Sequence, residues 1–237
     1  DGVWYDCVIP NYFDPSEFEY KEEKKDYMLY LGRIIKSKGL DICIQLAEKL
    51  NMELIIAGQG DLKSIGYDKI PKNVKYVGAA DMQKRKELMS NAKCLLLPTY
   101  YLEPFGNVVI EAFLSGTPVI TTDWGAFAEI NLHGITGYRC RTFEQFMWAV
   151  KNINKIKPSE CYKWAKSNFS MERVTEMYDE YFDMLYKLFM KKGFYEPNES
   201  RTDLNWLYKE YPSNAEEHTK NTLKDLIEKI DKLDSTN

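Results

Sequence analysis

Short apolar runs alternate along the chain with stretches whose apolar residues recur at helical spacing. The runs lie at positions 27–31, 53–57, 74–77, 94–98, 118–122 and 137–140. Continuous apolar runs, in place of in-and-out alternation, are typical of strands in a parallel sheet that is covered on both faces. The alternation of strand and helix therefore predicts an α/β fold, a Rossmann-like doubly wound parallel sheet with helices on both faces.

Helices are predicted between the strands at 40–50, 83–92 and 107–115, and three more follow the sheet. Thr142 and Gln145 have capping-box spacing and predict a helix start there. A second helix is expected at 159–166, and a long one from Ser170. The apolar face of the long helix predicts helix packing and comprises Met171, Val174, Tyr178, Tyr181, Leu185 and Leu188.

The last 45 residues have a different character from the rest of the chain. Gly, Pro and polar residues at 193–213 indicate a linker. Apolar residues then recur among charges at helical spacing, which predicts one amphipathic helix, either a loosely docked tail or a partner-binding element. They are Leu223, Ile227, Ile230 and Leu233.

Composition narrows the class of protein. The 237 residues are 44% hydrophobic, enough for one domain plus a helical C-terminal extension. A net charge of -4 without a basic block argues against nucleic acid as a partner. Five widely spaced cysteines suggest neither disulfides nor a zinc site, which favours a cytoplasmic location, with peripheral membrane association left open. No apolar run reaches the length of a membrane span, and no signal peptide is apparent.

Two cations follow the first predicted strand. The segment GRIIKSKG places Arg33 and Lys38 in the loop that leads to the next helix. Ligands of open α/β sheets bind at the carboxyl ends of strands, where helix N-termini favour anions, so a diphosphate fits this loop. The alternative is that both residues are ordinary solvated charges.

Two carboxylates follow the fourth predicted strand, in EPFGNVVIEAFL. Glu103 precedes a helix N-terminus at which the amides of Phe105, Gly106 and Asn107 can meet a ligand oxygen. It either reaches past the phosphates to a sugar or only stabilises the helix dipole. Glu111 lies in a helix that is apolar nearly all round. It binds a ribose diol, or it is a structural residue bonded to backbone or to an Arg.

Three other features receive simpler interpretations. The segment AGQGD lacks the third glycine of a dinucleotide fingerprint, although Gly58 can form a turn on the phosphate side. His133 is interpreted as a surface residue. No set of residues has metal-ligand spacing, so we expect no metal and no cofactor, with Arg33, Lys38 and the helix dipole balancing the phosphate charge.

The order of GRIIKSKG, AGQGD, VKYVG, LPTYYLEPFGNVVIEAFLSGTPVITTDWGAFAE and HGITGY resembles the C-terminal domain of the group 1 glycosyltransferases. These are retaining enzymes with the GT-B fold, and the resemblance covers about residues 7–190. It implies that Arg33 and Lys38 bind the donor diphosphate, that Glu103 contacts the transferred sugar and that Glu111 binds the ribose. The backbone after Glu103 would cradle the β-phosphate and sugar. Gly32, Gly58 and Val77 complete the expected donor site.

The resemblance also implies a domain division. Residues 1–14 look like an interdomain hinge, 15–192 like the nucleotide-sugar-binding domain, and 193–237 form the linker and tail. The chain does not begin with Met, and we expect an N-terminal GT-B domain before it. Without that domain, Trp164 and Tyr181 are expected to be unusually exposed. TTDWGAFAE departs from the family, in which two glycines often precede the Glu, so the pocket near Gly125 and Ala126 is expected to differ.

The expected activity is transfer of a hexose from a nucleoside-diphosphate sugar, such as a UDP- or GDP-hexose, to a glycan, lipid or protein acceptor. Two alternatives stay open at this point. One is a non-catalytic nucleotide-sugar-binding module, and the other is a GT-B-like sugar-nucleotide epimerase. The spacing from Glu103 to Glu111 favours the transferase over the epimerase.

Overall fold

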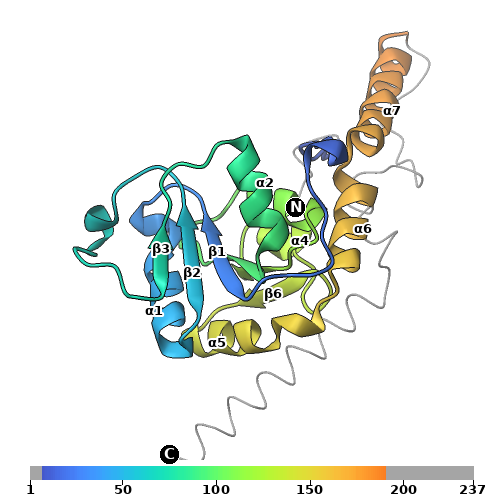
Figure 1. The fold of residues 1–237 in the computed structure, drawn as a ribbon. Coiled ribbons are helices and arrows are strands. Elements are labelled where there is room, and N and C mark those ends of the chain that lie inside the picture. The colour runs from blue at the N-terminus through green and yellow to red at the C-terminus, as the bar shows by residue number, and fades with distance from the viewer. Residues whose placement is uncertain (1–6, 191–237) are drawn as a thin grey trace, which may run out of the picture.

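The computed structural model describes residues 7–190, and its strands form one parallel sheet, as the apolar runs predict. The sheet order is β3-β2-β1-β4-β5-β6 (Figure 1). The strands are β1 Tyr27–Leu31, β2 Glu53–Ala57, β3 Val74–Tyr76, β4 Cys94–Leu97, β5 Val119–Thr122 and β6 Gly137–Cys140. The predicted linker and tail at 193–237 lie outside the described residues.

Seven α-helices accompany the sheet in the described part of the chain. They are α1 Leu40–Leu50, α2 Met82–Asn91, α3 Asn107–Leu114, α4 Phe127–Ile130, α5 Phe143–Asn152, α6 Pro158–Phe169 and α7 Met171–Phe189. Short 3-10 helices lie at Pro15–Glu17, Lys36–Lys38, Leu62–Ile65 and Ile153–Lys155. None of the helices between residues 7 and 190 is both long and apolar enough to cross a membrane.

The strand order reverses beside β1. The chain builds outward from β1 to β2 and β3, then returns to place β4 on the other side of β1. It then continues outward to β5 and β6. At such a reversal the loops leaving the two central strands diverge, which opens a crevice at their carboxyl ends. The expected anion-binding loops follow β1 and β4, so the topology brings them to this crevice.

The core lies between the sheet and two helical layers. Helix α1 contacts α5 on one side, whereas α3 contacts α2 and α6 on the other. Every residue of β1 is buried, and Met28, Leu29 and Tyr30 have no exposed surface. Each such side chain contributes about 1.5–3 kcal/mol on burial, so the central strand is held firmly in place beneath the crevice.

Local signals place the helix starts. The predicted capping box forms at α5, where Thr142 accepts a hydrogen bond from the amide of Gln145 and the Gln145 side chain bonds back to the cap. Asp81 caps α2 and Ser170 caps α7 through their side chains. The helix predicted at 159–166 extends over Pro158–Phe169 because proline suits the first turn of a helix.

Helices α6 and α7 carry Trp164 and Tyr181, the two residues expected to be unusually exposed. Trp164 is fully buried, and its indole Nε1 donates to the carbonyl of Ile130 at 3.0 Å. The prediction that it would be exposed is wrong because α6 packs on α3 within the same body. Tyr181 is half-buried.

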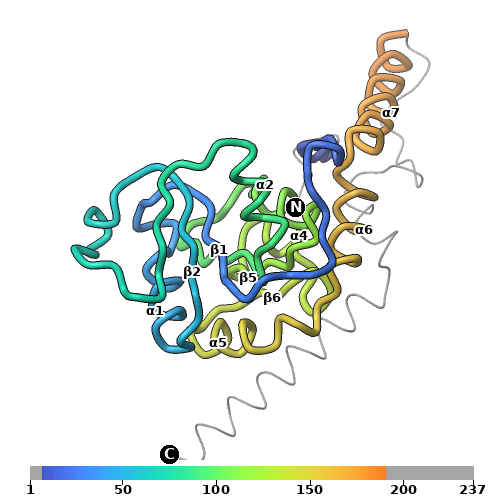
Figure 2. The backbone as a smooth tube through the Cα atoms, in the orientation of Figure 1, coloured from blue at the N-terminus to red at the C-terminus, as the bar shows by residue number. Residues whose placement is uncertain are grey.

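Helix α7 projects away from the sheet (Figures 1 and 2). Val174 and Met177 are buried near its start, but further along the predicted apolar face no residue is buried, so the predicted packing holds only for the first two turns. The exposed large hydrophobic residues of this helix and its C-cap are Met171, Tyr178, Phe182, Leu185, Tyr186, Phe189 and Met190.

The segment before β1 is anchored at the junction of α6 and α7. The amide of Phe13 donates to the carbonyl of Phe169, and the amide of Met171 donates to the carbonyl of Phe13, both at 2.9 Å. Figure 2 shows this segment running past the start of α7. The chain therefore enters the domain body next to the point at which α7 leaves it.

Lys24 ties the ends of two helices together, and Lys24→Met is expected to destabilise the fold. Its Nζ donates to the carbonyls of Ser90 and Ser115, at the ends of α2 and α3. Loss of a buried hydrogen-bond partner costs about 1–3 kcal/mol. Urea unfolding should show this loss, whereas the exposed Lys25→Met serves as the control. Equal stability of the two variants would contradict this role.

Candidate functional site

An open cleft of about 500 Å³ lies at the carboxyl edge of the sheet, where the strand order reverses. The loops after β1 and β4 form its floor, and the first turns of α3 form one wall. The lining residues are Asn11, Tyr30, Leu31, Gly32, Arg33, Lys38, Arg85, Leu97, Tyr101, Glu103, Pro104, Phe105, Gly106, Asn107, Val108, Glu111 and Phe127.

The loop after β1 presents two cations differently. Arg33 is exposed at the cleft, and its carbonyl accepts a hydrogen bond at 2.7 Å from the hydroxyl of Tyr30, which fixes the backbone. None of the ion pairs among residues 7–190 includes Arg33. Lys38 is only 17% exposed and lies deeper in the cleft. The two cations therefore differ in their access to a ligand.

Glu103 is held by two groups at the same carboxylate oxygen. Its Oε2 accepts from Lys38 Nζ at 2.7 Å and from the Tyr101 hydroxyl at 2.6 Å. The Lys38 ammonium also lies 4.7 Å from the centre of the Tyr101 ring. Burial alone would lower the pKa of Lys38, but the hydrogen bonds and charges of Glu103 and Tyr101 raise it, so the ammonium stays charged. No hydrogen bond from the described residues engages Oε1.

The N-terminus of α3 faces the same space. Gly106 is its N-cap residue and has a positive φ of 84°, with no side-chain cap hydrogen bond. A Cβ at this position would lie 2.8 Å from the Phe127 ring, so only glycine fits here. Because the first amides of a helix lack partners within it, the amides of Asn107 and Val108 are oriented to meet an anion.

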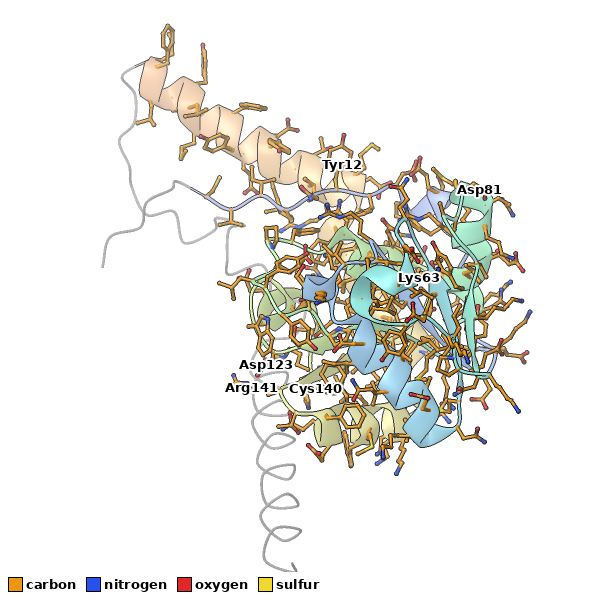
Figure 3. The ribbon with its side chains drawn as sticks, turned by 90° about the vertical axis from the view of Figure 1, so that its left-hand side faces the viewer. Tyr12, Lys63, Asp81, Asp123, Cys140 and Arg141 are labelled. Atoms are coloured by element: carbon orange, nitrogen blue, oxygen red, sulfur yellow. The ribbon has the colours of Figure 1, made fainter. Side chains whose placement is uncertain are left out.

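The loop after β5 supports Glu103 from behind. The amide of Ala126 donates to the carbonyl of Glu103 at 2.9 Å, and a Cβ on Gly125 would lie 2.7 Å from the Glu103 nitrogen. Asp123 anchors this loop through an ion pair with Arg141 at 2.9 Å, and both side chains are labelled in Figure 3. The single glycine of this loop thus packs against the backbone of the Glu103 loop.

Glu111 does not stand alone in its helix. Arg85 of α2 pairs with its Oε2 through Nη2, and both residues line the cleft. They also line an adjoining cavity of about 320 Å³ that extends toward Phe13 and Phe18. The Glu111 side chain is 18% exposed, so it faces the cleft despite its ion pair. The ion pair fits the alternative in which Glu111 is a structural residue bonded to an Arg. It still leaves the carboxylate accessible to a ligand.

The structure brings most of the predicted site residues into one cleft. Gly58 and Val77 are not among the lining residues. Gly58 follows β2 and Val77 follows β3, one and two strands away from β1, and Gly58 packs so tightly that a Cβ would meet the carbonyl of Gly32 at 1.7 Å. The predicted residues that do line the cleft are Gly32, Arg33, Lys38, Glu103, Phe105, Gly106, Asn107 and Glu111.

Sequence reasoning did not find Arg85, Tyr101 or Asn11 as cleft residues. Asn11 donates a hydrogen bond at 2.8 Å to the side chain of Asn107, which joins the predicted hinge to the start of α3. Tyr101 carries a signal in the sequence, since it stands two residues before Glu103 in the same loop. Arg85 carries none, because its approach to Glu111 depends on how α2 and α3 pack.

The prediction that His133 lies at the surface is wrong. Its side chain is buried, and Nδ1 accepts a hydrogen bond from the amide of Arg139 at 3.0 Å. Its ring also packs edge-on against Tyr138. The loop between α4 and β6 folds back on β6 and thereby buries His133 in a structural role.

Comparison with known proteins identifies relatives of this chain. Residues 14–167 match the model of the family "Glycosyl transferases group 1". An uncharacterized glycosyltransferase of Methanocaldococcus jannaschii is 30% identical over 204 residues, which cover 70% of this chain and 52% of that relative. The chain thus spans about half the length of this curated relative.

Solved structures share the fold. AviGT4, a glycosyltransferase involved in avilamycin A biosynthesis, superposes with a TM-score of 0.67 at 23% sequence identity. The superposed region covers 75% of this chain and 58% of the AviGT4 chain. Anabaena HepE, solved in complex with UDP, superposes with a TM-score of 0.66 at 18% sequence identity. The superposed region covers 75% of this chain and 57% of the HepE chain. Both likenesses concern the arrangement of the sheet and its helices.

Proposed function

Since this chain belongs to the group 1 glycosyltransferases, we propose that its cleft binds the nucleoside-diphosphate sugar from which a hexose is transferred to an acceptor. The observation that carries the proposal is the convergence of Arg33, Lys38, Glu103 and Glu111 with the N-terminus of α3 in one cleft. This set contains separate groups for a diphosphate, a sugar and a ribose.

The diphosphate lies between the β1 loop and α3 in this proposal. Arg33 is exposed and contributes a full positive charge to the first contact. The Lys38 charge is partly offset by Glu103, so the amides at the start of α3 supply the remaining stabilisation. No group of three acidic, His or Cys residues in the described part of the chain could hold a metal ion. Metal independence stays a prediction.

Glu103 contacts the transferred sugar in this proposal. Its Oε2 is engaged by Lys38 and Tyr101, which leaves Oε1 to accept hydrogen bonds from sugar hydroxyls. A carboxylate accepts from neutral hydroxyls without repelling them, whereas a phosphate in the same place would be repelled. The pairing of Glu103 with Lys38 supports an arrangement in which the sugar binds beside the diphosphate.

The reaction breaks the bond between the sugar anomeric carbon and the diphosphate oxygen, and the diphosphate departs with the electron pair. The acceptor hydroxyl oxygen bonds to the anomeric carbon, and its proton passes to the departing diphosphate. Negative charge grows on the leaving group, and preorganised cations and amides stabilise such charge most effectively. We propose that Arg33, Lys38 and the α3 amides do this work, with retention of configuration as in the family.

The acceptor is proposed to bind on a part of the enzyme beyond this chain. Because the chain spans about half the length of its curated relative, it supplies one wall of the cleft in this proposal. We propose cytoplasmic action, with the acceptor drawn from glycans, lipids or proteins. The family match favours this transferase over a non-catalytic binding module or an epimerase.

Calorimetric titration of the chain with UDP, GDP and ADP tests the proposal directly. We expect one of the diphosphates to bind at a single site and its nucleoside to bind far more weakly, since the diphosphate contacts dominate. The HepE complex makes UDP the first ligand to try. Failure of all three diphosphates to bind would contradict the proposed donor site.

The variant Glu111→Gln is expected to weaken binding of ribose nucleotides while the fold survives. Its amide keeps the shape of the side chain but offers one weaker acceptor in place of a carboxylate. We expect the dissociation constant of the ribose ligand to rise about tenfold, as for the loss of one charge-assisted hydrogen bond. Calorimetry with the ribose and 2′-deoxy forms of one nucleotide measures the difference.

An exposed carboxylate outside the cleft provides the control for that variant. Glu144 lies in the first turn of α5, and Glu144→Gln should bind both ligands as the unmodified protein does. Equal losses for the ribose and 2′-deoxy ligands in Glu111→Gln would show that Glu111 does not contact the diol.

A further inference from the structure

Arg85 stands at the boundary between the donor cleft and the adjoining cavity. It belongs to the first half of α2, whereas Glu111 belongs to α3, and the two helices pack side by side. Both residues line the cleft of about 500 Å³ and also the cavity of about 320 Å³. Their ion pair therefore lies where the two spaces adjoin.

The ion pair leaves part of each residue accessible. Nη2 of Arg85 engages only Oε2 of Glu111, and no hydrogen bond from residues 7–190 engages Oε1. The Arg85 side chain is 41% exposed and that of Glu111 is 18% exposed. A ligand in the cleft can therefore approach Glu111 at Oε1 while Arg85 stays in place at Oε2.

A carboxylate without a partner in this place would be a poor receptor for a diol. Val109, Ile110 and Ala112 beside it are fully buried, so the helix surroundings are apolar. A partly desolvated carboxylate without a fixed partner rotates toward water, which turns its oxygens away from a ligand in the cleft. A guanidinium on Oε2 opposes this rotation.

We propose that Arg85 is a positioning residue for ribose recognition, which fixes Oε2 of Glu111 and directs its Oε1 at the 2′,3′-diol of the donor nucleotide. This inference rests on the proposed function of the cleft. It adds a residue of α2, a helix outside the motifs that indicate the donor site, to the determinants of nucleotide selectivity. Arg85 acts through Glu111 and makes no contact with the diol.

The test compares UDP with 2′-deoxy-UDP, and GDP with 2′-deoxy-GDP, by calorimetry on the full 237-residue chain. Arg85→Met keeps the length of the aliphatic stem and removes the charge. We expect the ribose nucleotide to bind about tenfold more weakly to this variant and the 2′-deoxy nucleotide to change by less than about twofold. Arg85→Lys, which restores a cation, should recover most of the preference for ribose.

Lys84→Met is the matched control. Lys84 precedes Arg85 on the same helix and pairs with Glu87 on the exposed surface, at 2.9 Å, outside the cleft. Its loss removes one cation from α2 and should leave both affinities unchanged. Thermal melting of each variant checks the fold, and Arg85→Gln replaces Arg85→Met if the latter melts before the titration temperature.

The double variant and the two single variants distinguish the role of Arg85 from the ribose-binding role of Glu111. If Arg85 acts through Glu111, then Arg85→Met with Glu111→Gln loses no more ribose preference than Glu111→Gln alone. Retention of ribose preference in Arg85→Met, with its loss in Glu111→Gln, would overturn the role of Arg85 while the donor site stands. Retention in both variants would refute the ribose assignment itself, and with it the proposal for Arg85.

Discussion

Glu103→Gln is expected to lower the turnover number of the enzyme that contains this chain by about a hundredfold, with the affinity for the nucleoside diphosphate nearly unchanged. A hundredfold loss corresponds to about 2.7 kcal/mol of transition-state stabilisation. The carboxylate is fixed by Lys38 and Tyr101, so the substitution removes a charged acceptor whose position is already set. Steady-state transfer kinetics and calorimetry on the same preparation measure the two quantities.

This separation of turnover from binding distinguishes two roles for Glu103. If Glu103 only stabilises the dipole of α3, its substitution would lower the stability of the protein by about 0.3–1 kcal/mol and leave turnover unchanged. The control is Glu129→Ala, which removes an exposed carboxylate of α4 that does not line the cleft. Unchanged turnover in Glu103→Gln would therefore reduce Glu103 to a dipole-stabilising residue.

Joint replacement of Arg33 and Lys38 with Ala is expected to weaken binding of the diphosphate by about 3–5 kcal/mol, since hydrogen bonds to charged groups contribute about 1.5–3 kcal/mol each. Binding of the nucleoside should barely change. Part of the loss in diphosphate affinity comes from Glu103. Without Lys38, the Glu103 carboxylate loses its ion pair and repels the phosphates.

Two further variants resolve these contributions. Lys38→Ala combined with Glu103→Gln removes the repulsion and should bind the diphosphate more tightly than Lys38→Ala alone. Lys36 belongs to the same short helix as Lys38, but it is exposed and does not line the cleft. The Lys36→Ala variant should therefore bind the diphosphate with unchanged affinity. Equal losses of nucleoside and diphosphate affinity in the Arg33 and Lys38 variant would show that these residues are not phosphate ligands.

The sequence was sufficient to predict the sheet, because its signals are local. The six apolar runs coincide with the six strands, and the capping box at Thr142 forms as predicted. Arg33, Lys38 and Glu103 could be placed at one edge because strand ends in a parallel sheet share an edge. The pairing of β1 with β4 then makes Lys38 and Glu103 neighbours, although 65 positions separate them.

The errors arise where packing across the chain decides the outcome. His133 is enclosed where its own loop folds back on β6 and bonds to Arg139, whereas Trp164 is enclosed by packing that brings it to Ile130, 34 positions away. The partnership of Arg85 with Glu111 depends on the relative rotation of α2 and α3, which the helical spacing of apolar residues does not fix. Side chains from separate elements meet only once the tertiary structure exists.

The bridge between Phe13 and Ser170 makes the body of the domain a nearly closed loop of chain. Chain termini that lie together permit a domain to be inserted into another polypeptide, or its ends to be rejoined elsewhere, with little strain. The segment that enters the body at Phe13 and helix α7, which begins at Met171, therefore start side by side.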